Sequence, residues 1–433
     1  MNKKFKLDEI VKIAGRVGWK GYTVEDLRDE GPWVIGANDI TIDNQLDLSK
    51  AKHISREKYE ESPEIMIEKD DILIVKVGST IGKVAIVNKE IGEACINPNS
   101  VILKNCKVNP SYLYYYLISP AGQSFLKNNS SASAQSALNQ MTLKEMPVEL
   151  PDEKTQIKVG KILNDLNSKI ELNNRINAEL EAMAKTIYDY WFVQFDFPHE
   201  FKTVKTDKSG RRTELVEVKP YKTSGGKMVW NEELKREIPE GWEVKELNRF
   251  SNTASGGTPL STNKKYYENG NIPWINSGEL NSPFIIEGKK FITKAGIENS
   301  SAKMFEANTL LVALYGATAG KVSLLQIEAC TNQAVCAIIP KSKVYTNYLK
   351  FAFDDLYNHM INLSTGSARD NLSQDLIGDL KFIISDEVLL TLFNQIVHPI
   401  INKITLNLKE NQKLTELRDW LLPMLMNGQV KLK

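Results

Sequence analysis

The chain has 433 residues, and its 55 Lys and Arg side chains against 54 Asp and Glu give a formal net charge of +1. This length is roughly that of three typical domains, so two or more domains are expected. The even charge balance excludes a strongly basic, histone-like binder and an acidic tail protein, although a local basic surface remains open. Hydrophobic residues at 42% and charged residues at 25% are typical of a packed protein.

Cysteine spacing and hydropathy exclude several other classes. The cysteines form no C-x-x-C pair and are few for the length, which argues against a zinc site and a disulfide framework: Cys95, Cys106, Cys330 and Cys336. The first residues lack the apolar run of a signal peptide. The longest apolar runs, such as 72–75 and 310–314, have the length of strands. We therefore expect a cytoplasmic protein without a membrane span or a bound metal.

The chain repeats itself. The heptapeptide 78–84 resembles 316–322, the tetrapeptide 94–97 resembles 329–332, and Asp152-Glu153 matches Asp386-Glu387. These matches keep their order at a nearly constant offset of roughly 234 to 238 positions, as two copies of one unit would.

The residue pattern changes once within each copy. Short β-rich runs, broken by Gly, Asn and Pro, are followed by a long segment with almost no Gly or Pro. Each head should also hold a helix near its end, at 111–126 and 346–362, and Pro120 should break or kink the first. The predicted fold is α+β, with two similar α/β heads and a pair of long antiparallel coiled-coil helices related by a pseudo-twofold repeat. The predicted parts are a first head at 1–150, a first long helix at 151–195, a polar linker with a short hairpin at 196–236, a second head at 237–385 and a second long helix at 386–433.

Both long segments carry a heptad seam typical of a coiled coil. The first seam runs through Val159, Leu163, Leu166, Ile170, Asn173, Asn177, Leu180, Ala184, Ile187 and Trp191. The second runs through Phe393, Val397, Ile400, Ile404, Asn407, Asn411, Leu414, Arg418, Leu421 and Leu425. Near the middle of each seam, two successive seam positions are Asn. A buried Asn at such a position costs stability but fixes the register of the helices.

We expect the two helices to pack antiparallel, so that Asn173 and Asn177 face Asn411 and Asn407 and bond across the seam. Two features break the pattern: Pro399 should kink the second helix or start a new turn there, and Arg418 occupies a seam position. The alternative is two ordinary amphipathic helices, each packed on its own head.

The repeated G-x-x-x-G-K sequence resembles a phosphate-binding loop but is one residue short of a Walker A motif and is followed by Val. One interpretation is a tight turn that glycine permits between two strands. The other is a turn that presents polar side chains to a DNA phosphate: Thr80, Lys83, Thr318 and Lys321.

Two further regions have the composition of recognition loops. The first, 251–273, offers Thr258, Lys264 and Lys265. The second, 364–372, offers Ser367 and Arg369, and its counterpart in the first head offers Gln135 and Ser136. Arg can read guanine and Gln can read adenine, so these positions are candidate base contacts, although any single loop residue of this kind can simply be solvated. Trp274 and Tyr115 are expected in the core.

No catalytic constellation is visible. The chain contains no H-E-x-x-H, G-x-S-x-G or G-x-G-x-x-G motif, and no Asn-Pro-Pro-Tyr or Asp-Pro-Pro-Tyr of the kind that serves methylation of an exocyclic amine. The sequence thus predicts a protein without catalytic residues and without a cofactor of its own.

These features together resemble the specificity subunit of type I restriction–modification systems, over nearly the whole chain. The most specific motif is the C-terminal segment 417–428, Leu-Arg-Asp-Trp-Leu-Leu-Pro-Met-Leu-Met-Asn-Gly. Gly256-Gly257-Thr258-Pro259 followed by 272–275, and the entry 238–242, resemble the opening of the family's recognition domains. The first head departs from this pattern, because it opens with Gly21-Tyr22-Thr23.

The resemblance implies that each head reads one half of a split site in double-stranded DNA and that the helix pair sets the gap. It also implies two partner methyltransferase subunits and a restriction/translocase subunit, with S-adenosylmethionine and ATP/Mg bound by those partners. The residues leave open a specificity subunit of another restriction type, a coiled-coil scaffold for protein interactions and a free-standing methyltransferase.

Overall fold

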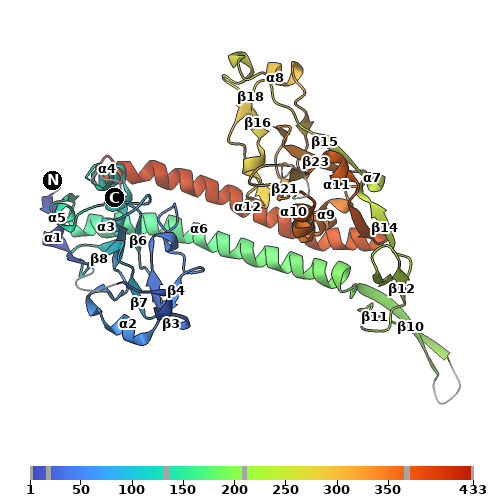
Figure 1. Cartoon of the computed structure of the whole chain (residues 1–433), viewed down its shortest axis with the longest axis horizontal. Helices are drawn as coiled ribbons and strands as arrows, with labels where there is room; N and C mark the ends of the chain where they lie inside the picture. Colours follow the sequence, from blue (N-terminus) through green and yellow to red (C-terminus); the bar gives the residue numbers. More distant parts are fainter. Residues whose placement is uncertain (1–2, 16–20, 130–136, 207–211, 365–370, 431–433) are drawn as a thin grey trace. The chain divides into compact units, whose positions relative to one another are not determined.

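The computed structural model describes residues 3–15, 21–129, 137–206, 212–364 and 371–430 (Figure 1). The chain forms two compact units, Met1–Glu171 with Asn411–Lys433, and Leu172–Glu410. The long helices are therefore not separate domains. Each is divided between the two units, and each unit contains one head with a section of both helices.

The first head is built on two sheets and a short strand pair. One sheet has the order β2-β8-β5-β6, and the other has the order β4-β3-β7, in which β3 and β7 are parallel. The pair β1-β9 closes the head. The strands are β1 Lys3–Lys6, β2 Lys12–Ala14, β3 Leu27–Ile35, β4 Lys52–Ile54, β5 Ile72–Val75, β6 Val84–Ile86, β7 Ala94–Ile96, β8 Ser100–Lys104 and β9 Pro147–Leu150.

The second head repeats this plan. Its sheets have the orders β15-β23-β20-β21-β17 and β18-β16-β22-β19, with β16 parallel to β22, and the pair β14-β24 closes it. The strands are β14 Glu243–Glu246, β15 Ser251–Ser255, β16 Ile272–Ile275, β17 Phe284–Ile285, β18 Phe291–Ile292, β19 Met304–Phe305, β20 Leu310–Ala313, β21 Val322–Leu325, β22 Ala329–Thr331, β23 Val335–Pro340 and β24 Lys381–Ile384. The matching strand orders confirm the predicted repeat.

Short helices complete both heads: α1 Leu7–Ile10, α2 Arg56–Glu60, α5 Gln140–Lys144, α7 Leu247–Phe250, α8 Lys294–Glu298 and α11 Gln374–Gly378. The longer helix expected in the first head is broken at Pro120, as predicted, into α3 Pro110–Ile118 and α4 Pro120–Asn128. Ser119 caps α4 by accepting a hydrogen bond from the backbone of Gly122. The second head shows the same break without proline, into α9 Tyr345–Asp355 and α10 Tyr357–Ser364.

The long helices are α6 Glu153–Tyr188, which continues as a π-turn over Asp189–Val193, and α12 Glu387–Met426. The expectation of a new turn at Pro399 is wrong, because α12 runs through this residue without interruption. Pro399 is exposed, so water can satisfy the carbonyl group that a proline leaves without its helical partner.

The segment between the repeats holds two hairpins rather than one, β10 Pro198–Thr206 with β11 Arg212–Pro220, and β12 Met228–Asn231 with β13 Arg236–Pro239. An aromatic cluster packs at the end of α6 in the second unit, around Tyr188, Phe192 and Trp242. Within the described residues, no helix combines the length and the apolar character needed to cross a bilayer.

Candidate nucleic-acid interface and helix pair

The two G-x-x-x-G-K segments are tight turns between antiparallel strands. In the first head the turn joins β5 to β6, and both of its glycines, Gly78 and Gly82, have positive φ angles of 101° and 89°. Gly316 and Gly320, between β20 and β21, do the same at 87° and 75°. A side chain would strain this conformation, which explains why glycine recurs at these positions.

Polar side chains tie each turn to its own head. Lys83 Nζ donates to the backbone carbonyl of Ile40 at 2.6 Å. In the second head, Lys321 Nζ donates to Asn281 Oδ1 at 2.5 Å, and the buried hydroxyl of Thr318 donates to the carbonyl of Ser277 at 2.8 Å. These contacts favour the interpretation of a structural turn for three of the four residues. Thr80 is half-buried, and its role in DNA contact stays a prediction.

The Gly-Gly-Thr-Pro segment is a close-packed corner of the second head. A Cβ atom on Gly256 would lie 2.1 Å from the carbonyl oxygen of Thr331, and one on Gly257 would lie 2.3 Å from Ser301 Oγ. The indole of Trp274 is buried, as expected, and donates to the Gly257 carbonyl at 2.9 Å. Tyr115 is also buried. The corner fixes the start of the loop that follows it.

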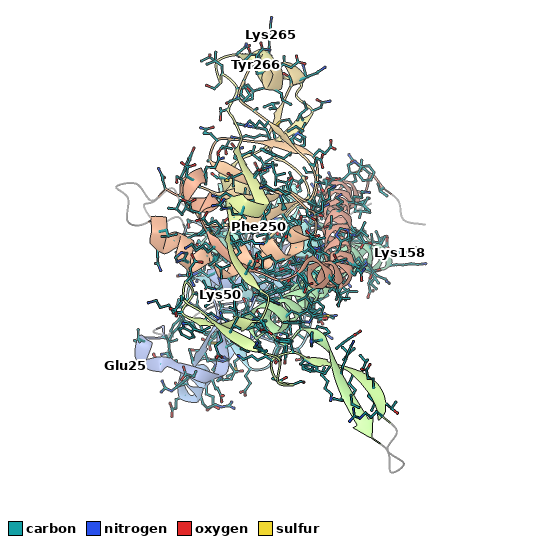
Figure 2. All side chains as sticks on the ribbon, turned by 90° about the vertical axis from the view of Figure 1, so that its right-hand side faces the viewer. Glu25, Lys50, Lys158, Phe250, Lys265 and Tyr266 are labelled. Atoms are coloured by element: carbon teal, nitrogen blue, oxygen red, sulfur yellow. The ribbon has the colours of Figure 1, made fainter. Side chains whose placement is uncertain are left out.

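That loop carries the exposed candidates. Thr258 is exposed and donates to the side chain of Gln333, while Lys264 and Lys265 lie on the 3-10 helix Lys264–Tyr266. Lys265 projects at the tip of the second head (Figure 2). This short helix rests on α8, where Gly296 leaves room for the backbone of Tyr266. The packing on α8 therefore supports a segment with two exposed lysines, a residue type that contacts phosphates.

The remaining candidates, Gln135, Ser136, Ser367 and Arg369, lie outside the described residues. The described residues that follow these positions make equivalent contacts in the two heads. The amide of Leu138 donates to the carbonyl of Lys76, and the amide of Leu372 donates to that of Leu314, both at 2.8 Å. Each bond lies just before a glycine turn, so the two heads share this arrangement.

The sections of α6 and α12 in the second unit run antiparallel. In the second unit, Asn407 Nδ2 donates to Asn177 Oδ1 at 2.8 Å, and Asn173 Nδ2 donates to Glu410 Oε2 at 2.8 Å. The partner number rises as the residue number on α6 falls, which defines an antiparallel pair. Asn411 is buried, and its pairing with Asn173 stays a prediction.

The seam position of Arg418 is explained within the first unit. Its guanidinium donates to Asn167 Oδ1 at 3.0 Å, and Asn167 Nδ2 donates to the hydroxyl of Tyr115 at 2.8 Å. Burial raises the pKa of Tyr115, so the phenol stays protonated. A series of hydrogen bonds from Arg418 on α12 through Asn167 on α6 to Tyr115 in the head thus takes the place of an apolar contact at this seam position.

Sequence reasoning missed a second apolar face on the long helices. These side chains are exposed, in contrast to the seam, and on α12 they comprise Val388 at 79%, Leu392, Ile396, Leu406 at 63%, Leu417 and Trp420 at 58%. On α6 they are Ile157, Leu172 and Met183. We call the α12 set the outer stripe. The signal was available in the sequence as apolar residues in excess of one seam.

The described residues contain no group of three or more His, Cys, Asp and Glu side chains placed to hold a metal ion. Cys95 and Cys336 are buried, and burial raises the pKa of each thiol to about 12. Both are therefore neutral thiols at neutral pH.

Two repeats of an α/β head, each continued by a long helix, define a two-headed protein with an internal repeat. The family model for the type I restriction modification DNA specificity domain matches residues 2–182 and 239–416. The chain therefore belongs to this family, and it is a type I specificity subunit with two DNA-recognition domains.

Relatives and a solved structure agree over most of the length. The chain is 27% identical over 403 residues to the type I restriction enzyme HindI specificity subunit of Haemophilus influenzae, covering 84% of this chain and 87% of that protein. It is 25% identical over 438 residues to the MjaIX specificity subunit of Methanocaldococcus jannaschii, covering 99% and 93%. The crystal structure of a type I S subunit from M. genitalium matches with a TM-score of 0.63 at 16% identity, covering 98% and 96%, which supports the fold.

Proposed function

We propose that this chain determines which DNA sequence a type I restriction–modification complex recognises, and that it performs no chemistry itself. The observation that carries the proposal is the duplicated head, because two similar readers on one chain suit a target of two separated half-sites. Each head reads one half-site in double-stranded DNA. The helix pair sets the length of the unread gap between them.

The second head offers a surface for the DNA backbone. Lys264 and Lys265 are exposed at its tip, and Lys289, Lys290 and Lys303 are also exposed in the same head. Phosphate contacts from lysine supply affinity without sequence information. Base readout then falls to neighbouring loop side chains such as Thr258.

The outer stripe supports the docking of partner protein. At roughly 100° per residue, its residues fall within about a third of the circumference of α12, on the side opposite the buried Leu390, Phe393 and Val397. An exposed apolar stripe on a helix that is already packed on its other side is typical of a surface that a partner covers. We assign this surface to two methyltransferase subunits, and the assembly then recruits a restriction/translocase subunit.

Chemistry belongs to the partners in this proposal. S-adenosylmethionine would bind the methyltransferase subunits, and ATP with Mg²⁺ would bind the restriction subunit. The absence of a catalytic motif from the sequence supports this division.

The test is to express the chain with and without its partner methyltransferase and to map modified bases across a genome by sequencing. The proposal predicts a single motif of two specified halves around a gap of fixed length, which appears only when both proteins are present. Modification by the chain alone, or a continuous motif without a gap, would contradict it.

A further inference from the structure

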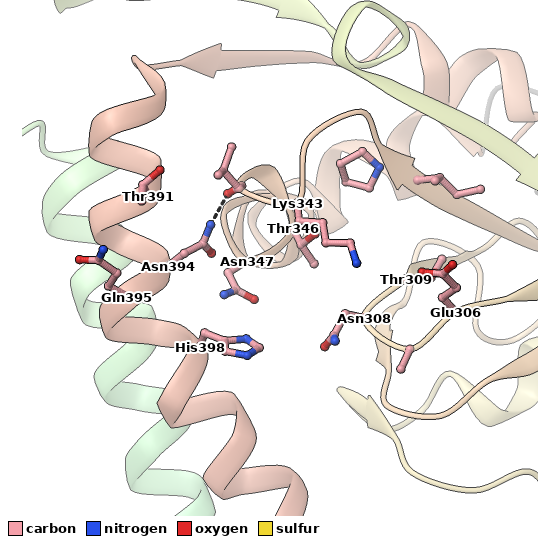
Figure 3. A pocket seen from close by; sticks show the side chains of 14 residues that line it. Glu306, Asn308, Thr309, Lys343, Thr346, Asn347, Thr391, Asn394, Gln395 and His398 are labelled. Carbon is pink, nitrogen blue, oxygen red and sulfur yellow. Dashed lines mark hydrogen bonds between the residues drawn. The ribbon is translucent and has the colours of Figure 1, made fainter.

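The second unit contains a cavity that neither the proposed DNA reading nor the proposed partner docking uses. It has a volume of about 510 Å³ and lies between α12, α9 and the turn that joins β19 to β20 (Figure 3). His398 and Asn308 face each other across it, and Asn347 and Asn394 line the wall between α9 and α12. This volume is in the range of small-molecule sites.

Two amides in the wall have polar atoms without a hydrogen-bond partner among the described residues. Asn394 Nδ2 donates to the carbonyl of Val344 at 2.6 Å, which fixes the orientation of the amide, while its buried Oδ1 accepts no hydrogen bond from the described residues. Asn347 is only 5% exposed, and its side chain makes no hydrogen bond to any residue that the structure describes. Of these groups only Asn394 Oδ1 is a fully buried atom without a partner in the described part of the chain, which is unfavourable unless a ligand supplies a donor, while the amide of Asn347 is not fully buried and can pair with the same ligand.

In the first head, direct side-chain contacts fill the location that is equivalent to this cavity. The hydroxyls of Tyr112 and Tyr348 donate to the carbonyls of Glu149 and Ile383, which lie at equivalent positions in β9 and β24. This equivalence aligns Ser111 with Asn347, and the offset of 234 positions between the seams of the long helices aligns Asn164 on α6 with His398 on α12.

In the first head these two positions are bonded directly, because Asn164 Nδ2 donates to Ser111 Oγ at 2.7 Å. Gly160, which corresponds to Asn394, brings α6 so close to α3 that a Cβ atom would lie 2.9 Å from Asn109 Oδ1. The second head replaces this tight contact with a cavity and amide side chains. The cavity is therefore a particular property of one head, not of the repeated fold.

The unpaired groups define the chemistry of the occupant. A free acceptor on Asn394 requires an N–H donor, and the amide of Asn347 beside it can pair with a ring nitrogen acceptor. In DNA recognition a single Asn pairs with the N6 amine and N7 of adenine through its oxygen and its nitrogen, and in this cavity Asn394 would supply the acceptor and Asn347 the donor. Val344 and Pro340 add an apolar wall for the flat face of a ring.

We propose that this cavity binds a nucleobase with an exocyclic amine. Lys343, exposed at the rim, places a positive charge where a phosphate attached to that base would lie. The base can come from a free nucleotide or from an unpaired position in a nucleic acid, and both sources share the recognised amine and ring nitrogen.

The test is calorimetric titration of the full chain with AMP and CMP, which carry the amine, and with UMP and inorganic phosphate, which do not. We expect saturable binding of AMP or CMP, about tenfold weaker in Asn347→Leu and in Asn394→Leu, as the loss of one hydrogen bond implies. Lys161→Ala, at the position in α6 that corresponds to Gln395, is the matched control and should leave binding unchanged. Heat denaturation verifies that each variant is folded.

No saturable binding at millimolar nucleotide would overturn the proposal, as would binding that both Asn variants leave unchanged. Equal binding of phosphate and AMP would reduce the cavity to an anion site at Lys343 and would also overturn it. A single-stranded oligo(dA) that binds more tightly than AMP, with the same loss in the variants, supports the nucleobase and assigns it to nucleic acid. Tighter binding of AMP than of oligo(dA) also supports the nucleobase proposal and assigns the ligand to a free nucleotide.

Discussion

Asn407 on α12 donates a buried hydrogen bond to Asn177 on α6, with 2.8 Å between Nδ2 and Oδ1, in the polar middle section of a mostly apolar seam. The two residues are 230 positions apart in the sequence. Each helix supplies one Asn from its copy of the repeat, so the pair joins the two copies. A polar pair of this kind favours one register over all others, because a shifted register would bury both amides without partners.

Substitution of Asn407 by Leu should destabilise the second unit by about 1–3 kcal/mol, because the buried Oδ1 of Asn177 loses its donor. The double variant Asn177→Leu with Asn407→Leu should recover most of this loss, because two apolar groups can pack where two amides were paired. Urea denaturation of the single and double variants measures the difference. Equal destabilisation of the two variants would show that the pair does not act as a unit.

Substitution of Gly256 by Ala should cost about 2–3 kcal/mol or more, since its Cβ would overlap the Thr331 carbonyl. Gly278 is a matched control in the same head, because nothing lies within 4 Å of a Cβ there. Gly278→Ala should stay within about 0.5 kcal/mol of the parent. Thermal denaturation measures the stability of both variants. Equal losses in Gly256→Ala and Gly278→Ala would exclude close packing as the reason for the Gly-Gly pair.

Replacing Lys264 and Lys265 together by Ala should weaken DNA binding by the assembled complex at every sequence. It should also reduce the slope of log affinity against log salt by up to about 2, since each lost phosphate contact removes about 0.9. Titrations at several salt concentrations measure the slope. An unchanged slope would remove these lysines from the interface.

Lys83→Met provides the contrast, because its ammonium group binds carbonyls of its own head. This variant should lose about 1–2 kcal/mol of stability and retain the salt slope of the parent. A folded variant with a lower slope would instead support a phosphate contact at Lys83.

Leu406→Asp should weaken assembly with the methyltransferase by at least about tenfold, because it places a charge in the outer stripe. The same change should leave the stability of the isolated chain nearly unchanged, since Leu406 is exposed. Analytical ultracentrifugation of mixtures measures the assembly, with Glu416→Ala as a control on the same helix. Normal assembly of Leu406→Asp would remove the outer stripe as a docking surface.

Glu181 on α6 should make the stability of the second unit depend on pH. Burial raises the pKa of this carboxyl, and the nearby Lys350 offsets only part of the effect. A raised pKa means that the stabilising, protonated form is fully present below the ordinary value of 4.5 and is lost as pH rises through the raised value. Glu181→Gln should therefore melt at a higher temperature than the parent at neutral pH, and this gain should vanish in acid. A gain that is the same at both pH values would contradict this account.

The repeat, the break at Pro120 and the glycine turns could be predicted from sequence, because each depends on local chain geometry or on self-similarity. The roles of Lys83 and Lys321 could not. Their partners, Ile40 and Asn281, are about 40 positions away, and only the folded head brings them together. A lysine in a loop has the same sequence signature whether it faces DNA or a carbonyl group.

The helices show the same division. The seam and its Asn positions follow from periodicity, so Asn177 and Asn407 could be placed in advance. The continuity of α12 through Pro399 depends on exposure of that side of the helix, which the heptad pattern alone did not reveal. The cavity beside His398 depends on single-residue differences between the two heads, such as Asn394 in place of Gly160, which the sequence repeat does not reveal.

The central claim is that two independent heads each read one half of the target. It is tested most directly by replacing residues 240–385 with the corresponding head of another family member and sequencing the modified sites in cells that contain the partner methyltransferase. The account predicts that one half of the motif changes, while the other half and the gap stay as they were. A change in both halves, or in neither, would contradict it.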